Sequence, residues 1–127
     1  MKKEWSKQWV SSKQPRKQRK YRAKAPLHIR RKMISAHLSK ELAKEHKKRS
    51  FPIRKGDKVK VLRGAFKGTI GEIEKVDRKK LKLHIKGVEK KKREGTAQTK
   101  IPIDPSNVII LSLNLSDKRR QTALARK

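Results

Sequence analysis

The chain has 127 residues, of which 40 are Lys or Arg and 11 are Asp or Glu, and its formal net charge at pH 7 is +29. This length allows one compact domain with tails, and this charge requires a partner rich in negative charge, which nucleic acid supplies best because phosphate neutralisation releases condensed counterions. The sequence has no cysteine and no apolar run of about 20 residues, which excludes disulfides, thiolate metal sites and a membrane-spanning helix.

Residues 1–24 are expected to form a basic arm. Its apolar residues after Met1 are few: Trp5, Trp9, Val10, Tyr21 and Ala23. Such a segment cannot bury enough apolar surface to offset the entropy lost on ordering, so we expect it to be disordered in the free protein and extended on its partner. The two tryptophans suit contact with RNA, with a neighbouring protein or with each other in a helix, but disorder is the simpler expectation.

Residues 25–49 change to helical spacing. Apolar side chains recur at intervals compatible with one face of a helix: Leu27, Met33, Ile34, Leu38 and Leu42. Pro26 suits a first helical position, where its missing N–H costs nothing, and Ser39 is suited to cap a second helix over residues 40–47. We therefore expect two short helices with a break over residues 35–39.

Residues 50–115 form the expected folded body, in which apolar and polar residues alternate with a period of two. Val59 and Val61 alternate with lysines, and the run at 81–85 repeats the pattern. Half-buried strands with one apolar and one basic face have this alternation. A third strand is expected at 70–76, between the other two.

Glycines and polar clusters separate these strands. Gly64, Gly68 and Gly71 permit either positive φ in turns or a bulge that bends a strand and closes a barrel. The remaining expected segments are a tight connection at 77–79, a charged hairpin or loop at 89–100 with its tip near Glu94, a final strand at 108–113, and a C-terminal tail at 116–127 with a short helix over 118–124.

The glycine-containing segment resembles a known module. The pattern Gly56-Asp57-x-Val59-x-Val61-x-x-Gly64-x-x-Lys67-Gly68-x-x-Gly71-x-Ile73 is similar to the KOW motif of ribosomal proteins and transcription elongation factors. The flanks resemble the archaeal and eukaryotic branch of the L-twenty-four family of large-subunit ribosomal proteins, called L-twenty-six in eukaryotes. The segments that carry this resemblance are 16–21, 25–31, 38–42, 49–50 and 105–108. It covers about residues 12–120, so the first eleven and the last few residues have no expected role.

The resemblance implies a mainly β fold: an SH3-like barrel, the KOW domain, with a basic N-terminal arm, short helices before the barrel and a short C-terminal helix. It also implies a structural constituent of the ribosome that binds the 5′ region of large-subunit ribosomal RNA, supports early subunit assembly and lies near the peptide tunnel exit. The expected partners are this RNA and neighbouring large-subunit proteins, with no homo-oligomer, membrane, small-molecule substrate or cofactor. The expected location is the cytoplasmic ribosome, and the nucleolus during assembly if the source is eukaryotic.

Cations and aromatic residues along the arm, the helical segment and the barrel are the expected RNA contacts, because Lys and Arg neutralise phosphates and aromatic rings stack on unpaired bases. These residues, together with two glycines, are Arg16, Lys17, Arg19, Lys20, Tyr21, Arg22, His28, Arg30, Arg31, Lys32, Arg49, Lys58, Lys60, Arg63, Gly64, Phe66, Lys67, Gly68, Lys80 and Lys82. Phe66 suits either stacking on RNA or a place at the end of the barrel core. The glycines suit turn formation, close backbone approach to RNA, or both.

Nothing in the sequence indicates catalysis. The four histidines lack cysteine partners and metalloprotease spacing, no phosphate-binding loop of the P-loop type occurs, and the 11 acidic residues are scattered as expected for local salt bridges and caps. A KOW-type accessory module of the transcription machinery is disfavoured by basic arms on both sides of the motif. A basic nuclease is disfavoured because clustered carboxylates for metal ions are missing. An anionic membrane surface and a secretory signal are disfavoured because neither a basic amphipathic helix with a broad apolar face nor an N-terminal apolar stretch occurs.

Overall fold

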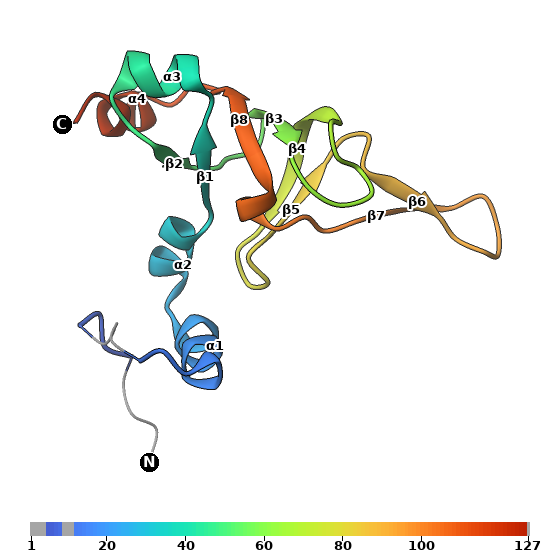
Figure 1. Ribbon diagram of the computed structural model, residues 1–127, viewed down its shortest axis with the longest axis horizontal. Helices are drawn as coiled ribbons and strands as arrows, with labels where there is room; N and C mark the ends of the chain where they lie inside the picture. The colour runs from blue at the N-terminus through green and yellow to red at the C-terminus, as the bar shows by residue number, and fades with distance from the viewer. Residues whose placement is uncertain (1–4, 9–11, 127) are drawn as a thin grey trace.

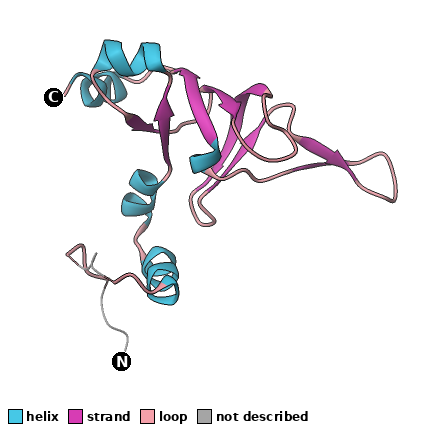
Figure 2. Ribbon diagram, viewed as in Figure 1, coloured by secondary structure: helices cyan, strands magenta, loops and turns pink. Residues whose placement is uncertain are grey.

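The computed structural model describes residues 5–8 and 12–126. The elements in chain order are α1 (Pro15–Lys24), α2 (Leu27–Met33), β1 (Ser35–Leu38), α3 (Lys40–His46), β2 (Ser50–Pro52), β3 (Lys58–Val61), β4 (Ile70–Asp77), β5 (Lys82–Ile85), β6 (Glu89–Lys91), β7 (Gln98–Lys100), the 3-10 helix η1 (Pro105–Asn107), β8 (Val108–Ser112) and α4 (Lys118–Ala125). Figure 1 shows α1 and α2 extending away from the sheet on one side and the β6–β7 hairpin projecting from another. The fold is a mainly β core with helices before and after it (Figure 2).

Six strands form one sheet in the order β2-β1-β8-β3-β4-β5. Strand β1 runs parallel to β8, and the other neighbouring strands are antiparallel. In this register His37 lies opposite Ile109, and Val61 lies opposite Val108. The last strand of the chain therefore lies inside the sheet, between β1 and β3, while β6 and β7 pair separately as a hairpin.

The inward-facing side chains of the sheet form the hydrophobic core. Its completely buried members are Val59, Val61, Ile73, Leu83, Ile85, Val88 and Ile110. In β3 the exposed Lys58 and Lys60 alternate with the buried valines, which is the pattern of a strand with one face in the core. The structure thus confirms the predicted strands, which run over 58–61, 70–77, 82–85 and 108–112.

The strand pairing leaves the sheet open. Strands β2 and β5 stand at opposite ends of the strand order, and no ladder joins them among the described residues. Apart from its ladder with β4, β5 makes one isolated bridge, between Leu83 and Ile103. The predicted β core and C-terminal helix are present, whereas closure into an SH3-like barrel is not confirmed.

Side chains cap the N-termini of α3 and α4, and the cap of α3 is the predicted Ser39. The Ser39 side chain accepts a hydrogen bond from the Leu42 N–H at 3.4 Å, which begins α3. Asp117 accepts one from the Arg119 N–H at 2.9 Å and begins α4. Each bond satisfies one of the N–H groups that a helix leaves without an internal partner.

Residues Pro15–Lys24 form the helix α1, which corrects the expectation of an arm without regular structure. Pro15 at the first turn, a run without β-branched residues, and the cations Arg22 and Lys24 at the negative end of the helix dipole all favour a helix here. The helix ends before Ala25, which is extended, as residues that precede a proline generally are.

The break expected over residues 35–39 contains the strand β1, which includes Leu38 from the predicted helical face. Its backbone groups pair with β2 on one side and β8 on the other, and the side chains of Ala36 and Leu38 are buried in the core. Helical spacing did not reveal this strand because a short apolar run is compatible with either period. Pro26 lies one residue before α2 rather than within it.

Candidate nucleic-acid interface

Helix α1 carries the densest group of predicted RNA contacts. Its members are Arg16, Lys17, Arg19, Lys20, Tyr21 and Arg22, all exposed except the half-buried Tyr21. None of the ten residues of α1 is buried. Because successive residues of an α-helix are about 100° apart, these cations cover the sides of the helix other than the one with Gln18 and Tyr21. The helix therefore displays positive charge over more than half of its circumference.

The aromatic ring of Tyr21 packs against Trp5. The two ring centroids are 4.9 Å apart with an interplanar angle of 31°, and Trp5 Nε1 donates a hydrogen bond to the Tyr21 carbonyl oxygen at 3.1 Å. This contact ties residues before α1 to the helix and covers part of the Tyr21 ring. Trp9, the other tryptophan of the arm, lies outside the described residues.

Arg30, a predicted RNA contact, has its guanidinium engaged within the chain. Its Nε donates to the Ala25 carbonyl at 2.9 Å, Nη1 donates to the Lys79 carbonyl at 2.8 Å, and Nη2 donates to the Ala23 carbonyl. The bonds to Ala23 and Ala25 hold the corner between α1 and α2, and the bond to Lys79 joins this corner to the β4–β5 turn. Three predicted contacts on the same helix are exposed: His28, Arg31 and Lys32.

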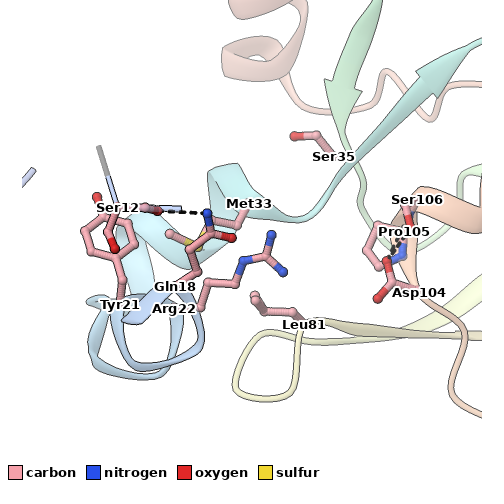
Figure 3. A pocket seen from close by; sticks show the side chains of 10 residues that line it. All are labelled: Ser12, Gln18, Tyr21, Arg22, Met33, Ser35, Leu81, Asp104, Pro105 and Ser106. Atoms are coloured by element: carbon pink, nitrogen blue, oxygen red, sulfur yellow. Dashed lines mark hydrogen bonds between the residues drawn. The ribbon is translucent and has the colours of Figure 1, made fainter. Parts of the chain in front are cut away.

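A pocket of about 610 Å³ lies where the arm meets the sheet (Figure 3). Apolar side chains line it from three segments, namely Met33 at the end of α2, Leu81 in the β4–β5 turn and Pro105 in η1. Figure 3 shows Arg22 of α1 reaching toward Leu81 across this space. Leu81 has a φ of 56°, in the left-handed region that residues other than glycine rarely adopt.

The predicted contacts of the sheet lie on β3 and in the loop that follows it. Lys58, Lys60, Arg63 and Lys67 are exposed. In the loop, Gly64 and Gly68 have φ values of 92° and 88°, and a Cβ atom at either position would meet open space. Their positive φ confirms the turn role of these glycines, and the open space around them leaves the backbone accessible. Phe66 is half-buried and packs against the core. This agrees with the alternative that placed it at the end of the core.

The remaining predicted contacts differ in whether they are exposed or already paired within the chain. Arg49 and Lys80 are exposed, whereas Lys82 is half-buried and its Nζ pairs with Asp104 Oδ2 at 3.0 Å. Burial alone would raise the pKa of Asp104, but hydrogen bonds from Ser106 and Lys82 outweigh it and lower that pKa. Lys82 therefore supports the start of η1 through the Asp104 carboxylate, and it also lies near the predicted RNA contacts.

The structure also groups five basic residues of which only Arg31 was predicted as a contact. The lining of a second groove, of about 620 Å³, includes Arg31, Arg54, Lys55, Lys75 and Arg78, together with Arg120, a sixth basic residue described below. The first five come from α2, the β2–β3 loop, β4 and the β4–β5 turn, and Arg120 comes from α4. No local motif connects these segments, so the sequence provides no signal for their assembly.

Asp57 and Arg120 form a buried ion pair, which corrects the expectation that the acidic residues serve only as local salt bridges and caps. Asp57 is 0% exposed and Arg120 is 3% exposed, and two bonds of 2.6 Å join the carboxylate to the guanidinium. The carboxylate also accepts from the N–H groups of Arg54 and Asn114, at 3.0 and 2.9 Å. This network attaches α4 to the sheet across 63 positions of sequence, a distance at which spacing carries no signal.

Across residues 5–8 and 12–126, no group of three or more His, Asp or Glu side chains is placed to hold a metal ion. In the same part of the chain, none of the helices combines the length and apolar character that crossing a membrane requires. The histidines are dispersed: His28 and His37 are exposed, while His46 and His84 are half-buried.

The fold and the surface define a small, strongly basic sheet protein that presents cations from several segments around a buried core. The family model of ribosomal proteins L26 (eukaryotic) and L24p (archaeal) matches residues 12–127, and the chain belongs to this family. It is 48% identical over 118 residues to the large ribosomal subunit protein uL24 of Korarchaeum cryptofilum, covering 93% of this chain and 89% of that relative. It is 47% identical over 116 residues to the protein of the same name from Methanosphaera stadtmanae, covering 91% and 98%.

Proposed function

We propose that this protein is a structural constituent of the large ribosomal subunit that binds large-subunit ribosomal RNA. Its relatives are large-subunit proteins, and its net charge of +29 matches a polyanionic partner. The observation that carries the proposal is the distribution of exposed cations over α1, α2, β3 and the β3–β4 loop, around a sheet whose core is fully formed. An RNA that contacts all these segments would hold the protein in one orientation.

The finer parts of the proposal follow the family resemblance. The RNA site lies in the 5′ region, the protein acts early in subunit assembly, and it sits near the tunnel exit beside other large-subunit proteins. Strands β3, β4, β5 and β8 with their connecting loops form a KOW module of the SH3-like type. The role is one of binding and support, without catalysis, homo-oligomers or cofactors, in the cytoplasmic ribosome.

The predicted contacts divide into two roles under this proposal. Exposed cations bind phosphates, while Arg30 and Lys82 position the elements that carry them, because both already bond within the chain. The positive-φ turns at Gly64 and Gly68 bring bare backbone to the RNA. The phosphate-binding set is Arg16, Lys17, Arg19, Lys20, Arg22, Arg31, Lys32, Arg49, Lys58, Lys60, Arg63, Lys67 and Lys80, with His28, Tyr21 and the exposed part of Phe66 contacting bases or riboses.

Sedimentation tests the assignment. An epitope-tagged chain expressed in an archaeal host should cofractionate with large subunits through a sucrose gradient at high magnesium. Cofractionation with RNA polymerase and absence from large subunits would instead support the transcription class. RNA cleavage in Mg²⁺ that a single Asp or Glu substitution abolishes would support an enzyme.

The salt dependence of RNA binding tests the electrostatic mechanism. If about ten phosphates are engaged, the logarithm of the affinity should fall against the logarithm of salt concentration with a slope of about −7 to −9. A transcript of the 5′ region of an archaeal large-subunit ribosomal RNA is the suitable probe, measured by filter binding. A nearly flat dependence would contradict an interface built on phosphate contacts.

A further inference from the structure

The groove of about 620 Å³ between α2, the β2–β3 loop and β4, here called the α2–β4 groove, has a strongly basic rim. Four of its lining residues, Arg31, Lys55, Lys75 and Arg78, are exposed, and only Arg31 belongs to the contacts predicted from the sequence. Its apolar lining includes Ile34 and Ile53, which are 1% and 4% exposed and belong to the core. The cations are thus held around a concave surface that the core supports.

The acidic residues of the groove already have basic partners. Asp117 pairs with Arg54, and Glu74 pairs with Lys100 at the base of the β6–β7 hairpin. The hydrogen bonds from these partners hold the pKa of each carboxyl below its usual value. Both carboxylates therefore stay charged and paired at neutral pH.

The four exposed cations of the rim form no such close pair, although Lys55 and Lys75 attract Glu74 and Asp77 from a longer distance. Within the described residues, no carboxylate oxygen lies within 4.0 Å of the charged nitrogens of Arg31, Lys55, Lys75 or Arg78. Like charges gathered at a concave surface repel one another and focus a positive potential there. An anion that enters the groove would relieve this repulsion.

We propose that the α2–β4 groove binds the sugar-phosphate backbone of RNA, as a contact surface distinct from β3 and its loop. This inference rests on the proposed function and names a further part of the RNA site. Two arginines at the rim favour phosphate, because a guanidinium binds it through two parallel hydrogen bonds. The groove also continues the predicted surface, since Arg31 lies on α2 beside the exposed Lys32, and Arg78 lies in the turn that carries Lys80.

A quadruple variant of the full chain tests the groove. Arg31→Gln, Lys55→Gln, Lys75→Gln and Arg78→Gln together should reduce the steepness of the salt dependence by about 3 units, because each lost phosphate contact removes about 0.7 to 0.9. The affinity at about 0.1 M salt should fall about tenfold or more. The probe is a transcript of the 5′ region of the Methanosphaera stadtmanae large-subunit ribosomal RNA.

A second quadruple variant provides the matched control. Lys40→Gln, Lys44→Gln, Arg119→Gln and Arg126→Gln remove the same charge from exposed positions on and beside α3 and α4. This variant should keep a slope within about one unit of the native protein. An equal loss of slope in both variants would overturn the groove, because total charge alone would then explain binding. Circular dichroism should show the same folded spectrum for both variants.

Site-directed crosslinking gives an independent readout, because the chain contains no cysteine. Lys75→Cys, modified with an azidophenacyl group, should crosslink to the transcript on irradiation, whereas Lys44→Cys on α3 should not. No RNA crosslink from position 75 in a protein that still binds the transcript would overturn the proposal. Competition by polyglutamate that removes the crosslink as effectively as unlabelled RNA would assign the groove to an acidic protein instead. If the unmodified native chain fails to bind the transcript at all, the proposed function itself fails.

Discussion

In the sheet, side chains such as Val59 and Ile85 are completely buried, whereas the ten-residue helix α1 buries none of its residues. The sheet derives its stability from apolar burial and from the Asp57–Arg120 network. Outside its own backbone hydrogen bonds, α1 is tied to the chain by Tyr21 against Trp5 and by the Arg30 bonds at its corner. Isolated helices of this length are marginal in water, so α1 should open far more often than the sheet.

Disruption of the buried ion pair should reduce the stability of the sheet more than the other substitutions described below. Arg120→Met leaves the Asp57 carboxylate buried without its guanidinium and should lower the free energy of unfolding by about 3 to 5 kcal/mol. Urea unfolding monitored by circular dichroism measures the change. The neighbouring Arg119→Met, at an exposed position, should cost less than about 0.5 kcal/mol. Similar values for the two variants would show that the pair does not anchor α4.

Glycine substitutions should cost less and should depend on position. A Cβ atom at Gly71 would lie 2.3 Å from the Lys86 carbonyl oxygen, so Gly71→Ala should lower the free energy of unfolding by about 1 to 3 kcal/mol through overpacking. A Cβ atom at Gly68 would meet open space, so Gly68→Ala should lower the free energy of unfolding by about 1 kcal/mol, through the strain of its φ of 88° alone. Chemical denaturation of both proteins checks this order, and a larger cost at Gly68 would contradict it. Gly68→Val, with a β-branched side chain in the same conformation, should also weaken incorporation into subunits.

Arg30 should affect the arm without affecting the sheet. Arg30→Gln removes most of the bonds that join the α1–α2 corner to the β4–β5 turn, so amide exchange in α1 should accelerate several-fold. The unfolding midpoint of the sheet should stay unchanged. Hydrogen exchange with mass spectrometry separates the two regions, with Arg31→Gln as the control. Unchanged exchange in α1 would mean that the corner does not depend on this guanidinium.

The smallest expected effect is on pH dependence. The hydrogen bonds from Arg54 and from the Arg119 N–H hold the pKa of Asp117 below its usual 3.8, so its contribution to stability is present above that value and is lost as the pH falls through the lowered pKa. Asp117→Asn keeps a capping side chain but removes the charge. Its thermal midpoint should be slightly below that of the native chain at pH 7 and should converge with it in acid, once the pH is below the lowered pKa. A constant difference across this range would exclude the carboxylate charge as the cause.

The two regions also differ in how well the sequence predicts them. Alternation around Val59 and Leu83 predicted the strands because a period of two has one physical origin, a face in the core. Composition suggested disorder for the arm, but local propensity and the Trp5–Tyr21 contact favour a helix there. Ser39 and Asp117 were predictable as caps, since a cap depends on the residues beside it.

What the sequence could not reveal depends on contacts between distant segments. The α2–β4 groove combines residues from 31 to 120, and Asp57 meets Arg120 only after α4 docks. The engagement of Arg30 by backbone carbonyls was equally hidden, because an arginine in a basic run looks the same whether it binds RNA or its own chain. Charge density thus identifies a basic surface, but the fold is needed to tell which cations are free to bind RNA and which bond within the chain.

The position of β8 has a consequence for biosynthesis. Residues 108–112 are the last strand to be translated, yet they lie between β1 and β3 and join them into one sheet. Until they emerge, β1 and β2 have no ladder to the remaining strands, and such non-local pairing is slow to form. We therefore expect the nascent chain to present its basic N-terminal half, already synthesised, while the sheet is still divided in two. The sheet should be completed only after residues 108–112 have left the ribosome that makes them.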